Sequence, residues 1–177
     1  MQKVPNDVVI KAQEGNMESF EQIYRVTSGF VYSTIFRIIH NRQESEDVLQ
    51  EVFLKVYRSL SRFRLESSFT TWVYRIAVNT ALTFCRKRKT GIKKMQNYKS
   101  NAGLNIDRPG NEFSLDKEAK RDLINSLLSN LSSSQRACIV LREIRGLSYK
   151  EIADVMRTSI NTVRSRLKRA REKLMSV

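Results

Sequence analysis

The chain has 177 residues, which allows one ordinary domain or two small ones. Its apolar fraction of 41% supports compact cores but not one large core. Lysine and arginine outnumber aspartate and glutamate by 32 to 18, giving a net charge of +14. Such an excess favours a polyanionic partner, usually nucleic acid and sometimes a membrane surface, although it also serves solubility.

The sequence lacks the signals of several other classes of protein. It has no run of about 18 apolar residues, so we expect no direct membrane insertion, and the stretch 1–15 is too polar for a signal peptide. Cys85, Cys138 and His40 show no metal-ligand spacing, so we expect neither a metal site nor a cofactor. Both cysteines lie in apolar helical stretches, where reduced thiols fit a cytoplasmic protein.

The first half of the chain has the apolar spacing of helices and no alternating pattern of a strand. Asp7 is expected to cap a short helix that ends at Gly15, and Ser28 and Gly29 are a candidate interruption of the next helix. The last helix of this half ends in the basic run 86–89, where cations favour the helix dipole. The expected helices cover 7–15, 17–40, 45–60 and 68–89.

The stretch 91–113 has the composition of a linker. It holds three of the six glycines, one of the two prolines and four asparagines, with little apolar periodicity. We therefore predict an all-α fold in which two small helical domains, 7–90 and 114–177, are joined by a flexible linker, with a helix-turn-helix in the second.

The second domain is expected to open with a leucine stripe and a capped helix. Ser133 is placed to cap that helix, and Gly146 is placed to end it. The leucine stripe comprises Leu123, Leu127, Leu128 and Leu131.

Residues 147–174 have the pattern of a helix-turn-helix. Ser148 and Glu151 match a capping box, Arg157 lies in the turn where a positive φ would favour glycine, and Ser159 can cap the second helix. That helix places Ile160, Val163, Leu167, Ala170 and Leu174 on one face and basic or polar residues on the other.

This amphipathic second helix can enter the major groove of DNA with its N-terminal part. Asparagine and arginine can read base edges there, whereas lysine, serine and threonine can hold phosphates. The alternative is a solvated basic helix packed on a core. The residues expected to bind duplex DNA are Ser148, Tyr149, Ser159, Asn161, Thr162, Arg164, Ser165, Arg166, Lys168 and Arg169.

Two segments of the first half resemble extracytoplasmic-function (ECF) sigma factors. Residues 61–80, SRFRLESSFTTWVYRIAVNT, resemble their promoter-melting segment, and residues 46–57, EDVLQEVFLKVY, resemble the run that precedes it. The helix-turn-helix looks like their second DNA-binding domain. Within this family the chain looks most similar to the envelope-stress, sigma-E-like group.

The resemblance implies a division of labour between the domains. The first would bind core RNA polymerase and the melted non-template strand of the minus-ten promoter element, and the second would bind the minus-thirty-five element as duplex. Such a protein does no covalent chemistry and has no small-molecule substrate. It works in the bacterial cytoplasm, and an anti-sigma factor is the expected regulator.

The resemblance also implies contacts for each domain. The polymerase contacts would be Asp47, Gln50, Glu51, Phe53 and Leu54. From the residues alone, this acidic helix start can equally be explained as compensation of the helix dipole. A basic, partly apolar partner would suit it as well.

Binding a melted strand requires cations for phosphates, a polar group for an exposed base edge and a wall for stacking. Asn79 is suited to the base edge, and by resemblance it would hold a flipped base together with the loop 63–68. Phe69 and Trp72 are expected in the core, whereas Phe63 can be either core or wall. The expected minus-ten residues are Phe63, Arg64, Ser67, Thr71, Arg75, Asn79, Arg86 and Lys87.

The chain departs from the family pattern at Ser132, where a proline is usual, and at Arg157, where glycine is common.

Two other classes of protein are alternatives to a sigma factor. A conventional helix-turn-helix regulator would more often carry a ligand pocket or an α/β receiver pattern in its first half. A nucleic-acid enzyme would need a set of metal-binding or catalytic residues, and no such set is evident.

Overall fold

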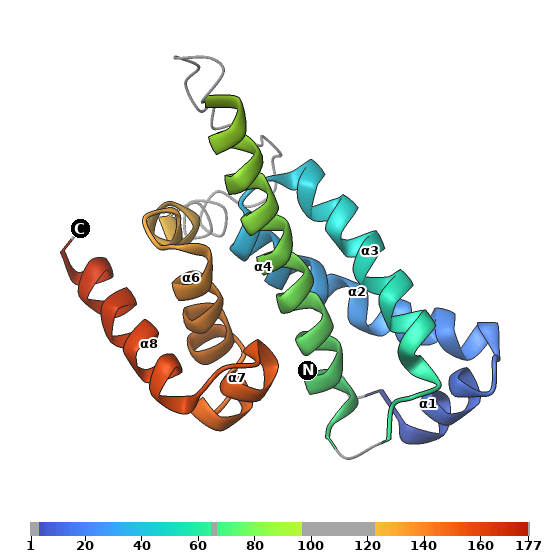
Figure 1. Ribbon diagram of the computed structural model, residues 1–177. Coiled ribbons are helices and arrows are strands. Elements are labelled where there is room, and N and C mark those ends of the chain that lie inside the picture. Colours follow the sequence, from blue (N-terminus) through green and yellow to red (C-terminus); the bar gives the residue numbers. More distant parts are fainter. Residues whose placement is uncertain (1–3, 65–66, 97–122, 177) are drawn as a thin grey trace.

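The regular elements of this computed structural model, which describes residues 4–64, 67–96 and 123–176, are all helical (Figure 1). This confirms the predicted all-α fold with two domains. The first domain contains α1 (Asn6–Gln13), α2 (Met17–Ile39), α3 (Arg42–Leu60) and α4 (Phe69–Gln96). The second contains a short helical segment over 123–129, α6 (Ser133–Ile139), the π-helical turn η1 (Val140–Ile144), α7 (Tyr149–Met156) and α8 (Ile160–Met175).

Asparagine side chains start two of the long helices in the first domain. Asn16 accepts a hydrogen bond from the amide of Ser19 at 2.8 Å, and Asn41 accepts from that of Glu44 at 2.9 Å. The predicted Asp7 cap is wrong, because α1 begins after Pro5 without a side-chain cap and Asp7 lies in its first turn. Helix α2 continues through Gly29 without interruption.

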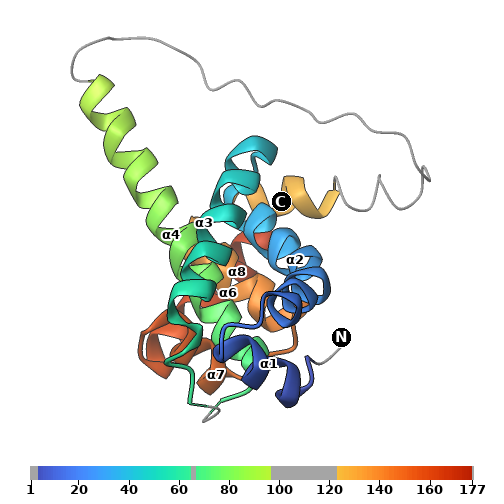
Figure 2. The same ribbon diagram turned by 90° about the vertical axis from the view of Figure 1, so that its right-hand side faces the viewer.

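Helix α4 is longer than the sequence indicated. It continues to Gln96, past the end expected near Lys89, so residues 91–96 are helical and do not belong to a linker. The rest of the predicted linker, 97–113, lies outside the described residues. The C-terminal end of α4 projects from the body of the molecule (Figure 2).

Most of the helix caps and turns of the second domain were predicted from the sequence. Gly146 adopts a left-handed conformation with φ of 72° and ends the turn after η1, as predicted. The cap of α6 is Ser132 and not Ser133, because Ser132 forms a capping box with Gln135. The leucine stripe is only partly buried, since Leu123 is 61% exposed while Leu128 is buried.

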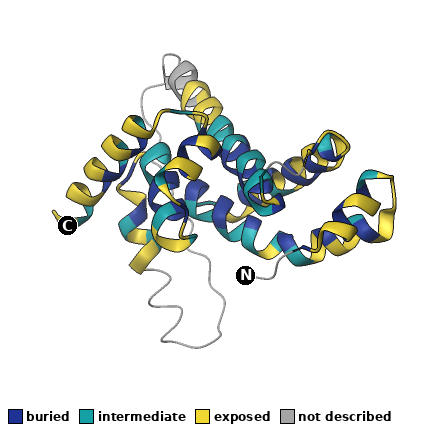
Figure 3. Ribbon diagram, turned by 90° about the horizontal axis from the view of Figure 1, so that it is seen from below, coloured by how far each residue is buried: buried dark blue, intermediate teal, exposed yellow. Residues whose placement is uncertain are grey.

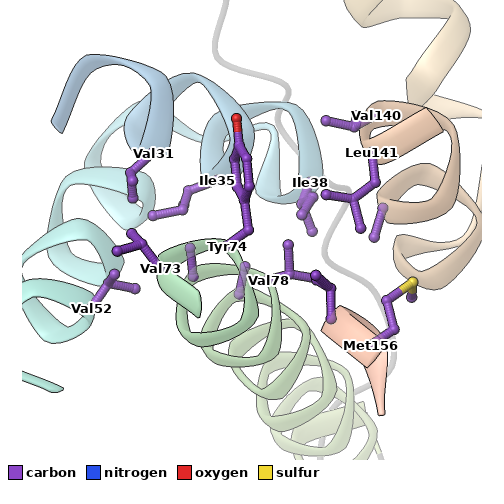
Figure 4. Close-up of a cluster of buried hydrophobic side chains, with 14 of the residues drawn as sticks. Val31, Ile35, Ile38, Val52, Val73, Tyr74, Val78, Val140, Leu141 and Met156 are labelled. Atoms are coloured by element: carbon purple, nitrogen blue, oxygen red, sulfur yellow. The ribbon is translucent and has the colours of Figure 1, made fainter. Parts of the chain in front are cut away.

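Each long helix buries one face and exposes the other (Figure 3). In the first domain, Val31 and Ile35 of α2 meet Val52 of α3 and Val73 of α4 (Figure 4). Full burial of such a side chain contributes about 1.5–3 kcal/mol. These contacts hold α3 and α4 against α2.

The core of the first domain continues without a break into the second domain. Ile38 of α2 and Val78 of α4 point toward Val140 and Leu141 of η1 and Met156 of α7 (Figure 4). Helix α4 therefore lies between the two halves of the molecule (Figure 1). Apolar periodicity predicted these residues to be buried but did not predict that the two domains would share a core.

His40 ends α2 in the left-handed region, with φ of 59°. Burial, followed by the nearby charges of Arg136 and Arg37, lowers the pKa of His40 from its usual 6.5 to about 4. The folded chain therefore holds this imidazole neutral at pH values where the unfolded chain protonates it.

We predict that acid destabilises the fold through His40. The free energy of unfolding is highest above pH 6.5 and falls as the pH drops toward 4, because the unfolded state binds the proton first. The variant His40→Asn tolerates a positive φ and cannot titrate. Urea unfolding at about pH 7.5 and about pH 5.5 should show a smaller loss of stability in the variant. An equal loss in both proteins would contradict this role.

Candidate nucleic-acid interface

The helix-turn-helix forms with the caps that the sequence predicted. Ser148 starts α7, and its backbone amide donates to Oε2 of Glu151 at 2.7 Å. Hydrogen bonds from Ser148 lower the pKa of the Glu151 carboxyl. Ser159 starts α8 by accepting from the amide of Thr162 at 3.1 Å. Between the helices, Arg157 is left-handed with φ of 50°, which confirms the strained turn position.

Helix α8 buries Val163, Leu167 and Ala170 against α6 and α7. Ile160 does not join this face as expected and is 39% exposed at the start of the helix. The predicted duplex-binding residues that are exposed are Ser148, Ser159, Asn161, Arg164, Ser165, Lys168 and Arg169. Apart from Ser148, which starts α7, they form a basic and polar outer face of α8 that begins at its N-cap, Ser159.

Three of the predicted duplex-binding residues are partly covered: Tyr149, Thr162 and Arg166. Arg166 is partly buried near Cys138, and its charge opposes the effect of burial on the pKa of that thiol. Burial is the larger effect and raises the pKa of Cys138 to about 11. The side chain of Tyr149 lies under the guanidinium of Arg142, 5.2 Å from the ring centre.

The predicted minus-ten residues of the first domain are distributed along α4 and the turn before it. Arg86 and Lys87 are exposed on the projecting part of the helix, and Thr71 lies in its first turn, hydrogen-bonded to Ser68. Arg75 and Asn79 are half-buried. Asn79 donates to the carbonyl oxygens of Arg75 in α4 and Val155 in α7, each at 2.7 Å.

Phe63 lies in the core of this structure, which is one of the two placements that the sequence left open. It is 6% exposed, and its ring centre lies 5.0 Å from that of Trp72 and 5.5 Å from that of Phe69. Arg64 is exposed and Ser67 is half-buried on either side of residues 65–66, which lie outside the described residues. In this structure Phe63 supports the turn before α4, and its place in a base pocket stays a prediction.

Gln13 is a residue of this region that sequence reasoning missed. Its amide nitrogen donates to the carbonyl oxygens of Leu60 at 2.9 Å and Phe63 at 2.7 Å. Gln13 in α1 thereby fixes the turn that leads into the predicted minus-ten loop. No local signal in the sequence could have paired it with carbonyls about 50 positions away.

The predicted polymerase-contacting residues follow the outer side of α3. Asp47, Gln50, Glu51 and Leu54 are exposed, and Leu54 is 55% exposed. Phe53 is buried at 6% exposure, because its ring packs edge-on against Tyr24 of α2 with centres 4.6 Å apart.

Exposed aromatic residues beside this row were missing from the sequence prediction. Tyr24 and Tyr57 are 43% and 48% exposed. Tyr57 packs edge-on against Phe20, with ring centres 5.1 Å apart. The four exposed α3 residues, Tyr24 and Tyr57 together are called the α3 ridge below.

Comparison with known proteins assigns the two halves to one family. Residues 23–90 match Sigma-70 region 2, and residues 121–174 match Sigma-70 region 4. The ECF RNA polymerase sigma-E factor of Haemophilus influenzae is 38% identical over 93% of this chain and 90% of its own length. The RNA polymerase sigma-H factor of Pseudomonas aeruginosa is 34% identical over 97% of this chain and 92% of its own.

Solved structures agree on the fold. The sigma factor RpoE of Bartonella quintana, solved in complex with the anti-sigma factor NepR, superposes with a TM-score of 0.71 at 23% identity, covering 90% of this chain and 96% of that one. CnrH, solved with the cytosolic domain of CnrY, gives 0.67 at 21% identity over 98% and 96%.

The protein is therefore a sigma factor, one of the proteins that direct RNA polymerase to promoters. Within that class the chain belongs to the ECF sigma factors, as the sequence resemblance indicated.

We predict that the left-handed turn residue of the helix-turn-helix limits its stability. A non-glycine residue in this region costs about 1–2 kcal/mol, and a β-branched residue fits it worst. Arg157→Val should therefore lower the melting temperature, whereas Arg157→Gly should leave it unchanged or raise it. Thermal unfolding followed by circular dichroism measures both. A valine variant as stable as the parent would contradict the strain.

Proposed function

We propose that this sigma factor docks on core RNA polymerase through the α3 ridge, holds the melted minus-ten strand along α4, and binds the minus-thirty-five duplex with α7 and α8. The observation that carries the proposal is the outer face of α8, which is basic and exposed on a capped helix-turn-helix. Polymerase supplies the chemistry of transcription, and this chain is not an enzyme in this scheme.

The charge and exposure of the α3 ridge support docking on a basic, partly apolar protein. Asp47 and Glu51 are acidic residues on the surface of a chain with a net charge of +14, and a DNA-facing surface would not gain from them. Leu54 and Tyr57 add exposed apolar area next to them. Phe53 supports Tyr24 of this surface from below.

The two DNA-binding parts differ in the form of DNA that they suit. On α4, Arg86 and Lys87 are placed for phosphates and Asn79 for an exposed base edge, which fits a single strand. On α8, Asn161 and Arg164 lie at the first turns, where a recognition helix meets base edges in the major groove.

The expected setting of the protein follows from this function. Core polymerase places it in the bacterial cytoplasm. An anti-sigma factor is the expected regulator, because the structurally similar sigma factor RpoE was solved in complex with the anti-sigma factor NepR. No helix in the described part of the chain is long and apolar enough to cross a membrane. The described residues contain no cluster of side chains suited to a metal ion, and the proposal involves no cofactor.

Run-off transcription with purified core polymerase tests the proposal. Addition of the protein should produce transcripts with a defined start from a promoter of its own regulon. A conventional helix-turn-helix regulator would bind its operator alone and produce no start, and that outcome would overturn the proposal.

We predict that Leu54→Arg weakens polymerase binding about tenfold or more, because it places a cation and removes apolar area at the centre of the ridge. Ile10→Arg is the matched control, since Ile10 is also an exposed apolar helix residue, 42% exposed, but lies on α1. Fluorescence anisotropy of labelled protein with core polymerase measures both affinities. Equal affinities for the two variants would remove the ridge from the proposed interface.

We predict that Asn79→Ala impairs promoter opening but not polymerase binding. The variant removes the amide proposed to hold a base of the melted strand, and Asn79 lies on a different helix from the α3 ridge. Permanganate reactivity of unpaired thymines should fall in the assembled holoenzyme, while its polymerase affinity does not fall below the parent value. Loss of polymerase affinity instead would contradict the assignment of Asn79.

A further inference from the structure

The projecting part of α4 has little apolar support (Figure 2). Phe84 and Cys85 pack against the core, whereas residues 86–91, which follow them, are all exposed. The hydrogen bonds of Arg86 and Thr90 stay within α4. In the described part of the chain, apolar packing therefore does not set the direction of the segment that carries the proposed phosphate contacts.

An ion pair ties this segment to the start of α3. Arg88 donates to Oε2 of Glu44 at 2.5 Å, across 44 positions of the sequence. The other salt bridges among the described residues of the first domain join positions four apart on a single helix. Within those residues, the pair of Glu44 and Arg88 is thus the one salt bridge that joins two helices of this domain.

Glu44 is held in a defined place by the capped first turn of α3. Its backbone amide donates to Oδ1 of Asn41 at 2.9 Å, and an acidic residue in a first turn is favoured by the helix dipole. The side chain of Glu44 is 28% exposed, against 42% for that of Arg88. Such partial cover reduces screening of the pair by salt. Glu44 is therefore a fixed anchor for a long, flexible cation.

Arg88 lies on the opposite side of α4 from the residues proposed to hold the melted strand. Because successive helix positions are offset by about 100°, Arg86 lies within about 20° of Asn79 around the axis, whereas Arg88 lies about 180° from it. An open groove of about 520 Å³ lies on the side of Arg86, lined by Thr83, Arg86, Lys87, Thr90 and Gly91. The ion pair therefore holds α4 from behind this groove.

We propose that Glu44 is a positioning residue for strand binding. It holds Arg88 from behind, so that Arg86 and Lys87 face the melted minus-ten strand in line with Asn79. The ion pair of Glu44 with Arg88 is called the brace below. Its role in strand binding rests on the function proposed above, whereas the brace itself does not.

The brace and a simple effect of charge predict opposite results for one substitution. Glu44→Gln keeps the size of the side chain and removes one negative charge, which raises the net charge of +14 by one. Electrostatic attraction alone would then strengthen DNA binding. The brace predicts weaker binding, because Arg86 and Lys87 lose their fixed direction and must be ordered when the strand binds.

Glu46→Gln is the matched control. Glu46 lies two positions later on α3, its side chain is 51% exposed, and it pairs with Arg42 on the same helix at 3.1 Å. Both substitutions change the charge equally at the same end of α3. A charge exchange, Glu44→Arg with Arg88→Glu, restores an ion pair at an unchanged net charge, whereas Arg88→Glu alone places two carboxylates together.

Hydrogen–deuterium exchange of the free sigma factor measures the brace itself. The amides of 86–91 should exchange about two- to fivefold faster in Glu44→Gln than in the parent, which is the range expected from a partly exposed ion pair. Arg88→Glu alone should also speed exchange, and the charge exchange should slow it again. Glu46→Gln should match the parent. Equal exchange rates in Glu44→Gln and Glu46→Gln would overturn the brace.

Fork-junction DNA with a single-stranded minus-ten segment from a promoter of the regulon measures strand binding by the holoenzyme. Glu44→Gln should bind it about two- to fivefold more weakly than the parent. Glu46→Gln should bind it at least as tightly as the parent, and the charge exchange should recover most of the loss seen for Arg88→Glu. Fluorescence anisotropy with core polymerase should give equal polymerase affinities for Glu44→Gln and Glu46→Gln.

Faster exchange of 86–91 without weaker strand binding would overturn the positioning role alone. A loss of polymerase affinity in Glu44→Gln that accounts for its weaker strand binding would overturn that role as well. If the parent holoenzyme did not bind the fork, the proposed function and the positioning role would both fail. The exchange rates would still decide whether the brace exists.

Discussion

Helix α4 packs against both halves of the molecule, and most of the structure depends on that double packing. Val73 and Tyr74 secure α4 to α2 and α3, whereas Val78 reaches η1 and α7 (Figure 4). A helix with apolar contacts over so much of its circumference has little surface left for another partner. Asn79 lies next to Val78, so the side chain best suited to a base edge is placed at the boundary of a protein interface. The packing of α7 and the proposed binding of a melted strand therefore involve the same part of α4.

Features that depend on neighbouring residues were predicted from the sequence, whereas contacts between residues far apart in the sequence were not. The caps at Ser148 and Ser159, the left-handed Arg157 and the stop at Gly146 all depend on neighbours within a few positions, and each was predicted. The contact of Arg145 with Phe30 spans 115 positions and has no local signature. Apolar periodicity marks which face of a helix is buried without naming the element that covers it. The shared core of the two domains therefore emerged only from the structure.

The candidate sites divide in the same way. Exposure of Asp47, Glu51 and Leu54 follows from their spacing on one side of α3, and the structure places them there. Phe53 is the neighbour of Leu54, and successive positions of a helix are offset by about 100° around its axis. Phe53 therefore faces Tyr24. A resemblance over a continuous stretch cannot separate these two neighbours, because it carries residue types and not directions. Burial identifies the residues that support a surface, and exposure identifies those that form it.

The exposed surfaces of the chain differ in how ready they are for a partner. The α3 ridge and the outer face of α8 are exposed, whereas Asn79 of α4 is half-buried and donates to the carbonyl oxygen of Val155 in α7. Under the proposed function, polymerase and duplex DNA can therefore meet the chain in this conformation, while a base of the melted strand can reach the amide of Asn79 only after that hydrogen bond breaks.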